Sequence, residues 1–161
     1  MDLEELEKRV RLQEDIQEIE HLQMMYGYYF DTQRWGDIVD LFSDNCESVE
    51  IVDHGVFKGK PGVEHVYVDV IGGRQTGPRP PWVAYVVMQM APVIDVAPDG
   101  RTARGRWQTW LFELKMYGAY PRQEYLHGYY ENKYVKENGK WKFFLLHWNN
   151  TFCSPVEDGW L

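Results

Sequence analysis

The sequence predicts an α+β fold in which N-terminal helices cover one long, curved antiparallel sheet. Apolar residues recur at helical spacing over residues 2–30, whereas residues 83–151 alternate as strands separated by turns. Helices that precede a single antiparallel sheet are typical of α+β domains. A sheet of this length twists, so we expect the helices to close its concave side into a cone that encloses a pocket.

The composition fits one globular domain over residues 1–161. Hydrophobic residues make up 44% and charged residues 26% of the chain, which indicates neither disorder nor a membrane span. The net charge of −8 argues against a nucleic-acid partner, because nucleic acids are polyanions. Cys46 and Cys153 lack metal-binding spacing and the N-terminus lacks a signal segment, so we expect free thiols in the cytoplasm and no membrane partner.

The helical region is predicted in two parts. Apolar residues at three- and four-residue steps indicate a helix over residues 2–30. Asp2 and Asp15 each stand three residues before a glutamate, the spacing of a capping box, so a break near Gln13 is expected. Thr32 can cap a short second helix, which forms a hairpin with the first.

The remaining elements follow from turn and strand signals. A strand is predicted over residues 46–52, and Pro61 is well placed as the first residue of a third helix. The proline-rich stretch 77–81 is predicted to be a loop. Asn138-Gly139 is a strong hairpin signal. The four long strands of the predicted meander span residues 83–96, 102–116, 123–136 and 141–151.

The chemistry is expected at the end of the first helix, where aromatic residues surround Asp31. Tyr26, Phe30 and Trp35 all lie within five residues of it. The negative pole of the helix and the apolar rings both disfavour a charged carboxylate, so Asp31 can act as a general acid or base. The alternative is that Asp31 caps the next helix and that the rings are ordinary core. Aromatic residues form 16% of the chain, which fits a pocket or a core equally well.

Cofactor chemistry has no support in the sequence. There is no dinucleotide fingerprint, phosphate loop, HExxH or CxxC motif, and no serine stands in a G-x-S-x-G setting. Asp53-His54 is weak evidence for a metal ion. We therefore expect no cofactor and no metal. The carboxylates, tyrosines and amides that remain suit acid–base chemistry such as elimination or isomerisation.

Three stretches carry a resemblance to a known family: IQEIEHLQMMYGYYFDTQRWGDIVDLFSDN, ARGRW and ENKYVKENGKWKF. Together with the element order, they resemble the SnoaL-like branch of the nuclear transport factor 2-like superfamily over nearly the whole chain. Scytalone dehydratase, bile-acid 7α-dehydratase and hexachlorocyclohexane dehydrochlorinase belong to this branch. The resemblance implies a single cone-shaped domain, cofactor-free lyase chemistry and a homodimer or homotrimer formed through the outer face of the sheet.

The resemblance also implies site residues. In those enzymes an aspartate at the helix corner forms a dyad with a sheet histidine, assisted by a helix tyrosine. Asp31 and Tyr26 match the aspartate and the tyrosine. Val87, or a near neighbour such as Met88 or Gln89, takes the place of the histidine, and the strand over residues 83–96 contains no histidine. The family dyad is therefore broken in this chain.

Two further polar residues complete the expected catalytic set. Glu50 stands where the dehydratases have a pocket tyrosine, and Asn150 corresponds to a polar pocket residue near the C-terminus. The resemblance implies that Glu50 faces inward and, by strand parity, that His127 and His147 face outward. Glu50 or Glu113, as a second carboxylate, could share acid and base roles with Asp31. The expected substrate-binding residues are Phe30, Trp35, Val87, Gln89, Trp107, Leu111, Glu113, Tyr130 and Trp148.

The sequence thus favours a cofactor-independent lyase that acts on a bulky aromatic or polycyclic small molecule. The reaction would be an elimination such as dehydration, or a C–C cleavage such as deformylation, with a quinone methide as intermediate. The superfamily includes lyases that release formaldehyde from lignin-derived diaryl compounds, which makes such a compound an example substrate. An isomerase or cyclase is compatible with the same groups. The alternative is a non-catalytic ligand-binding or dimerising interaction module, whose pocket would need only a few neutral polar groups.

Overall fold

The computed structural model describes residues 2–52, 54–74, 83–117 and 120–156. Helices and strands alternate only in the first half of the chain, and long strands fill the second half. The elements in order are α1 (Leu3–Asp31), α2 (Trp35–Asp40), β1 (Ser48–Ile51), β2 (Gly55–Lys58), α3 (Gly59–Glu64), the π-helix η1 (His65–Ile71), β3 (Ala84–Val96), β4 (Thr102–Tyr117), β5 (Tyr120–Glu137) and β6 (Lys140–Pro155).

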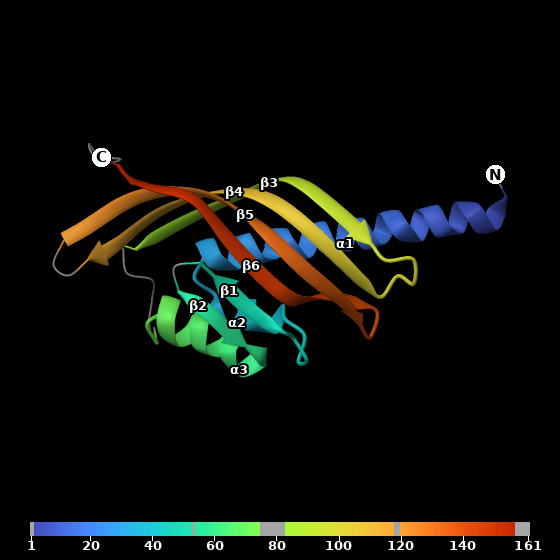
Figure 1. Ribbon diagram of the computed structural model, residues 1–161, viewed down its shortest axis with the longest axis horizontal. Helices are drawn as coiled ribbons and strands as arrows, with labels where there is room; N and C mark the ends of the chain where they lie inside the picture. Colours follow the sequence, from blue (N-terminus) through green and yellow to red (C-terminus); the bar gives the residue numbers. More distant parts are fainter. Residues whose placement is uncertain (1, 53, 75–82, 118–119, 157–161) are drawn as a thin grey trace.

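One six-stranded sheet organises the domain, with strand order β2-β1-β6-β5-β4-β3. The strands β3 to β6 form the predicted antiparallel meander, and β1 joins it parallel to β6. The meander arches over α1, while α2 and α3 lie with the short strands β1 and β2 (Figure 1). The predicted α+β fold with a curved sheet is confirmed.

Irregular residues give the sheet its curvature and its tight turn. The register of β3 against β4 shifts between Met90 and Val93, where Ala91 has a φ of 50°. A bulge of this kind bends a strand and increases its twist. Asn138 and Gly139 have φ values of 50° and 77°, as the two central residues of a type I′ turn require. The hairpin signal in the sequence is therefore confirmed.

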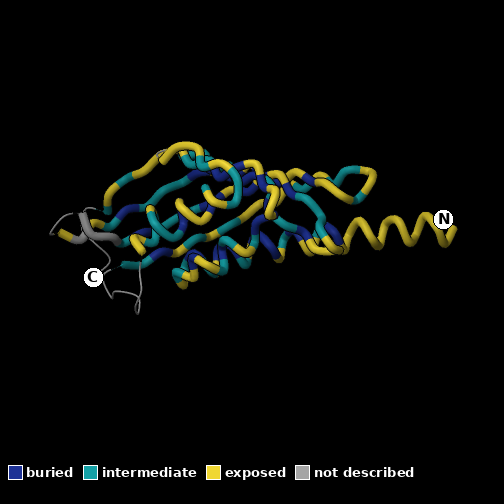
Figure 2. The backbone as a smooth tube through the Cα atoms, turned by 90° about the horizontal axis from the view of Figure 1, so that it is seen from below, coloured by how far each residue is buried: buried dark blue, intermediate teal, exposed yellow. Residues whose placement is uncertain are grey.

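The expected break near Gln13 is wrong, because α1 is one continuous helix from Leu3 to Asp31. Its first turns extend beyond the sheet and are exposed (Figure 2). Asp2 caps the helix as expected, since its Oδ1 accepts a hydrogen bond of 2.8 Å from the backbone N–H of Glu5.

Asp15 fastens α1 to the sheet instead of starting a second helix. Its Oδ1 accepts hydrogen bonds from Lys136 Nζ at 2.6 Å and from Trp141 Nε1 at 2.9 Å. A carboxylate in this position needs such donors, because only 8% of the residue is exposed. The local sequence pattern assigned Asp15 to a helix cap, but in the structure it forms an ion pair with a residue that is distant in the sequence.

The second helix also begins differently from the prediction. Thr32 does not cap it, because its Oγ1 donates a hydrogen bond of 2.7 Å to the carbonyl of Tyr28 at the end of α1. Arg34 precedes α2 and forms an ion pair of 2.7 Å with Asp37. Thr32 thus closes the preceding helix, and the chain turns through Gln33 with a φ of 56°.

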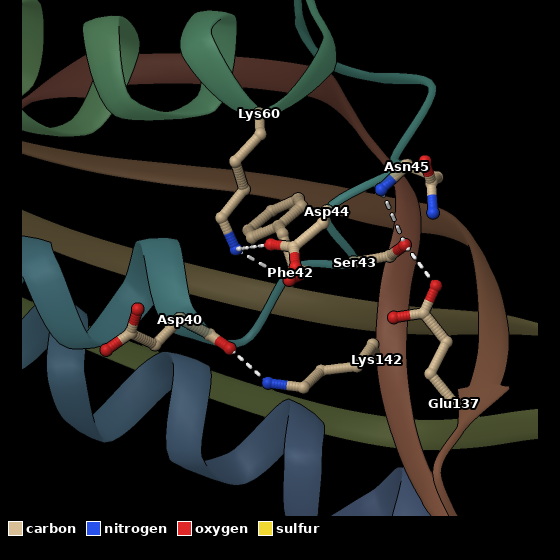
Figure 3. A network of polar contacts seen from close by, with 8 residues as sticks. All are labelled: Asp40, Phe42, Ser43, Asp44, Asn45, Lys60, Glu137 and Lys142. Atoms are coloured by element: carbon tan, nitrogen blue, oxygen red, sulfur yellow. Dashed lines mark hydrogen bonds and ion pairs between the residues drawn. The ribbon is translucent and has the colours of Figure 1, made fainter.

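The segment between α2 and α3 is tied to the β5–β6 hairpin (Figure 3). Ser43 Oγ donates to Glu137 Oε1 at 2.6 Å, and Lys60 Nζ donates to the carbonyl of Phe42 at 2.7 Å. These contacts hold α2 and α3 beneath the concave face of the sheet. They thereby fix the position of α2 and α3 relative to the meander.

Two local predictions were incomplete. The strand expected over residues 46–52 is β1, and its partner β2 was not predicted. The third helix begins at Gly59, two residues before Pro61. The loop expected at residues 77–81 lies outside the described residues. Among the described helices, none has the length and apolarity that a bilayer crossing would require.

Candidate active site

A cavity of about 600 Å³ lies between the concave face of the sheet, the end of α1 and η1. This volume suits a ligand of several rings. Aromatic and aliphatic side chains form most of its wall, and carboxylates, phenols, one imidazole and one thiol supply its polar groups. It is lined by Tyr26, Phe30, Ile51, His54, Val70, Ile71, Tyr85, Leu111, Glu113, Glu124, Leu126, Tyr130, Leu146, Trp148 and Cys153.

Phenol hydroxyl groups gather at one end of the cavity. Tyr67 donates a hydrogen bond of 3.1 Å to the hydroxyl of Tyr26, which also hydrogen-bonds Tyr130. Burial raises the pKa values of Tyr26 and Tyr130 well above the ordinary value of a tyrosine. It also raises the pKa of Tyr67. The cluster is therefore neutral near pH 7 and can donate a proton or a hydrogen bond.

Two carboxylates face each other at the other end. Glu113 on β4 is the direct partner of Glu124 on β5, and both side chains line the cavity. Only 5% of Glu113 and 4% of Glu124 is exposed. Glu124 lies six residues before Tyr130 on the same strand, a rise of about 20 Å. The glutamate pair and the phenols of Tyr26 and Tyr130 thus lie at opposite ends of the cavity, and Tyr85, which also lines it, is the strand partner of Glu113.

Three further polar side chains lie in the cavity wall or contact it. Arg122 Nε contacts Glu124 Oε1 at 2.8 Å, and half of the Arg122 side chain is exposed. His54, in the turn after β1, and Cys153 on β6 line the cavity as well. Among the described residues, no three His, Cys, Asp or Glu side chains are grouped as metal ligands.

Asp31 lies next to the strand that carries Val87, as the resemblance implies. Its Oδ1 accepts a hydrogen bond of 2.7 Å from the backbone N–H of Val87. Neither residue is among the described residues that line the cavity. In the position where the family has an Asp–His dyad, this chain therefore has a carboxylate bonded to the strand backbone. The catalytic role of Asp31 stays a prediction.

Three of the expected substrate-binding residues, Trp35, Gln89 and Trp107, are not among the described residues that line the cavity. Trp35 packs edge-on against Phe30, with ring centroids 5.2 Å apart. Gln89 hydrogen-bonds the buried Gln23, and Trp107 donates to the hydroxyl of Tyr134 at 3.0 Å. The polar network around Gln23 links α1 to the sheet.

Glu50 lies on the opposite face of the sheet from the one expected. Its neighbour Ile51 lines the cavity, and alternate residues of a strand point to opposite faces. Glu50 accepts a hydrogen bond of 2.8 Å from Ser48 and lies 3.5 Å from His147 Nδ1. The expected parity of β1 was therefore shifted by one residue.

The outward direction expected for the strand histidines agrees with the structure. His147 lies between Leu146 and Trp148, which both line the cavity, so it points to the other face. His127 packs against Trp110, with ring centroids 5.0 Å apart. Asn150 pairs with Gly128 in the sheet next to a register shift, and it does not belong to the described cavity wall.

Six expected site residues do line the cavity: Tyr26, Phe30, Leu111, Glu113, Tyr130 and Trp148. Sequence reasoning missed Glu124, although a signal for it was present. The predicted strands over residues 102–116 and 123–136 leave a short connection between them, and antiparallel pairing across its centre makes Glu113 and Glu124 partners. His54 and Tyr85 gave no comparable signal, because the cone brings them to the cavity from separate elements.

The fold and the cavity define a cone-shaped domain that encloses a site for a small molecule. The SnoaL-like domain model matches residues 11–147, so the chain belongs to the SnoaL-like family of the NTF2-like superfamily. No curated protein matches the chain at a significant level.

Solved structures of similar shape cover almost all of this chain. A scytalone dehydratase-like protein of Novosphingobium aromaticivorans DSM 12444 has a TM-score of 0.76 at 17% identity, with 92% of each chain covered. LinA has a TM-score of 0.78 at 14% identity, with 93% of this chain and 95% of LinA covered. Hexachlorocyclohexane dehydrochlorinase LinA-type3 of Novosphingobium barchaimii LL02 has a TM-score of 0.69 at 16% identity, with 93% of each chain covered. These likenesses establish the fold.

Proposed function

We propose that this protein is a cofactor-free lyase that acts on a bulky aromatic alcohol by acid–base catalysis. The observation that carries the proposal is the cavity itself. It buries the Glu113–Glu124 pair at one end and the phenol cluster of Tyr26 and Tyr130 at the other, with aromatic and aliphatic walls between them. A pocket that only binds a ligand needs neutral polar groups, whereas proton transfer needs titratable ones.

A carboxylate pair and a cluster of neutral phenols in one cavity suit a para-hydroxybenzylic alcohol as substrate. The phenol proton passes to one carboxylate of the glutamate pair, and the electron pair moves through the ring. The benzylic C–O bond then breaks, and the leaving hydroxyl takes the Tyr26 proton and departs as water. A quinone methide remains, with a protonated glutamate and a Tyr26 phenolate. Acid and base act on different atoms of the substrate in this step.

The Tyr26 phenolate completes the reaction. It removes a proton from the neighbouring carbon, a C=C bond forms, and the glutamate returns its proton to the ring oxygen. Burial raises the pKa of Tyr26, so its phenolate is a strong base. If the neighbouring carbon carries a hydroxymethyl group, the phenolate removes the hydroxyl proton instead. The C–C bond then breaks and formaldehyde leaves, as with a lignin-derived diaryl diol.

The same proposal includes an assembly of two or three copies through the outer face of the sheet. Trp110 there contacts Tyr125, His127 and Phe152, with ring centroids 5.0–6.3 Å apart. Exposed Met88 is the strand partner of Trp110. Contiguous exposed apolar surface of this kind is typical of an interface.

A non-catalytic ligand-binding module is the second candidate. The observation that favours it is the bond between Asp31 and the Val87 backbone, which occupies the position of the family dyad. This alternative predicts that aromatic ligands bind and leave unchanged.

The test uses a 1,2-diarylpropane-1,3-diol with two para-hydroxyl groups. We expect a stilbene and formaldehyde, detected by absorbance and by carbonyl trapping. The matched substrate is its para-methyl ether, which binds as an apolar ligand but cannot form a quinone methide. Equal turnover of the ether would contradict the quinone methide route. Binding of the diol with no product would favour the binding module.

A further inference from the structure

Gly128 on β5 lies directly against one of the aromatic side chains of the cavity wall. Trp148 on β6 lines the cavity, and its ring lies beside that of Tyr130, with centroids 4.8 Å apart. A methyl group built on Gly128 would lie 2.5 Å from Cη2 and 2.6 Å from Cζ2 of Trp148. The benzene ring of the indole therefore occupies the space that a side chain at position 128 would need.

The backbone at Gly128 is irregular as well. The register of β5 against β6 shifts between His127 and Gly128. The same methyl group would also collide with the backbone carbonyl oxygen of Asn149. Glycine inside a strand often marks a bulge or the close approach of another group. Both occur at Gly128, and together they let the indole of Trp148 lie against the sheet.

A side chain at position 128 would narrow the cavity. Carbon atoms in contact lie about 3.5–4.0 Å apart, so the indole of Trp148 would have to move by about 1 Å away from the strand. The cavity lies on that side of the ring, and Val70 and Ile71 of η1 line it from the helical side. The absence of a side chain at Gly128 thus keeps the cavity wide next to Trp148.

We infer that the Gly128–Trp148 pair is a specificity determinant that sets how wide an aromatic ring the cavity accepts. Because the indole lies against the sheet, the space beside it takes a ring with substituents on both edges. The substrate class is then a diaryl compound with substituted rings. This inference rests on the proposed site, and it names the substrate class of that site.

The experiment measures binding alone, with two stilbenes that differ in width. The slim ligand is 4,4′-dihydroxystilbene, and the wide ligand carries in addition a methoxy group on each side of both hydroxyl groups. Their dissociation constants are obtained by fluorescence titration at pH 7. In the unmodified protein we expect both ligands to bind, with constants within tenfold of each other.

A glycine-to-alanine pair of variants tests the role of position 128. Gly128→Ala should weaken binding of the wide ligand at least tenfold, because the indole moves into the cavity, and should leave the slim ligand within threefold. Gly105→Ala is the matched control. A methyl group there would lie 2.9 Å from Cε2 of Tyr134, which does not belong to the described cavity wall. Both ligands should therefore bind Gly105→Ala within threefold of the unmodified protein.

Trp148→Phe tests the same determinant from the opposite side and leaves the backbone at Gly128 unchanged. The smaller ring removes the atoms that lie against Gly128, so the cavity widens. The ratio of the two dissociation constants should change at least threefold in favour of the wide ligand. In Gly128→Ala/Trp148→Phe, the wide ligand should bind at least threefold more tightly than in Gly128→Ala, because the indole no longer fills the cavity.

Three results would overturn the inference. They are no binding of either ligand to the unmodified protein, an unchanged ratio of the two constants in Trp148→Phe, or a loss of the wide ligand in Gly105→Ala that equals the loss in Gly128→Ala. If Gly128→Ala does not fold, the ratio in Trp148→Phe decides alone. Changed ratios without turnover of the diol contradict only the lyase, whereas turnover of the diol with unchanged ratios contradicts only the specificity.

Discussion

Glu113 and Glu124 stand directly opposite each other in the β4–β5 ladder, with both carboxylates buried at the wall of one cavity. Like charges in facing strand positions destabilise a sheet. Titratable groups that lie together in a cavity are typical of sites of proton transfer, which agrees with the function that we propose.

The first prediction concerns the effect of the Glu113–Glu124 pair on the free energy of unfolding. Glu113→Gln should leave the free energy of unfolding at pH 7 unchanged or raise it by up to about 1 kcal/mol, because it removes a like-charge contact. The same variant should lower the turnover of the diol by about 10²–10⁴-fold, the usual contribution of a general base. Urea unfolding and initial rates measure the two effects. A loss of stability above about 2 kcal/mol would instead indicate a hydrogen bond that the fold needs.

The second prediction separates Tyr26 from a buried tyrosine outside the cavity. Tyr26→Phe leaves Tyr67 without its acceptor, and Tyr134→Phe removes the acceptor of Trp107. Each should cost about 1–3 kcal/mol of stability. Only Tyr26→Phe should lower kcat, by about 10²–10⁴-fold. Equal effects on kcat would show that Tyr26 acts through stability alone.

The third prediction decides between two roles of Asp31. Asp31→Asn keeps an oxygen that can accept from the Val87 N–H, whereas Asp31→Ala removes it. If the carboxylate is mainly an anchor, the alanine variant should lose about 1.5–3 kcal/mol, and Asp31→Asn should keep turnover within about tenfold. Loss of turnover in Asp31→Asn at an unchanged melting temperature would establish the catalytic role predicted from the sequence.

The fourth prediction concerns alkaline pH. Burial raises the pKa values of four phenols above the ordinary 10.0, namely Tyr26, Tyr67, Tyr130 and Tyr134. The unfolded chain releases these protons near pH 10, whereas the folded chain keeps them. Stability is therefore fully present below about pH 10 and is lost above it, by up to about 1.4 kcal/mol per pH unit for each phenol.

Urea unfolding between about pH 9 and pH 11 measures this slope. Tyr134→Phe should reduce this slope by the contribution of one phenol. Tyr120→Phe should leave it unchanged, because 79% of Tyr120 is exposed. A slope that does not depend on Tyr134 would contradict the assignment.

The fifth prediction concerns assembly. Trp110→Lys places a charge at the centre of the aromatic cluster on the outer face of the sheet, and it should shift the sedimentation coefficient to that of a single chain. Tyr28→Lys is the control, because Tyr28 is exposed on α1, away from that face. An unchanged oligomer in Trp110→Lys would exclude this face as the contact.

The sequence by itself determined the elements whose signals are local. The apolar spacing of α1, the turn at Asn138-Gly139 and the alternation of the four long strands predicted the α+β architecture. The family resemblance also implied that Tyr26, Tyr130 and Glu113 lie in the pocket, and the alternation of side chains on a regular strand keeps such an assignment valid along β4 and β5.

Only the tertiary structure decided which carboxylates share the cavity. A shift of one residue turned Glu50 to the outer face of β1, and strand pairing brought Glu124 opposite Glu113. Asp15 became an anchor for Lys136 and Trp141 because the curved sheet brings the β5–β6 hairpin against α1. Register, curvature and ion pairs between distant residues depend on the packed whole, so local pattern could not assign these roles.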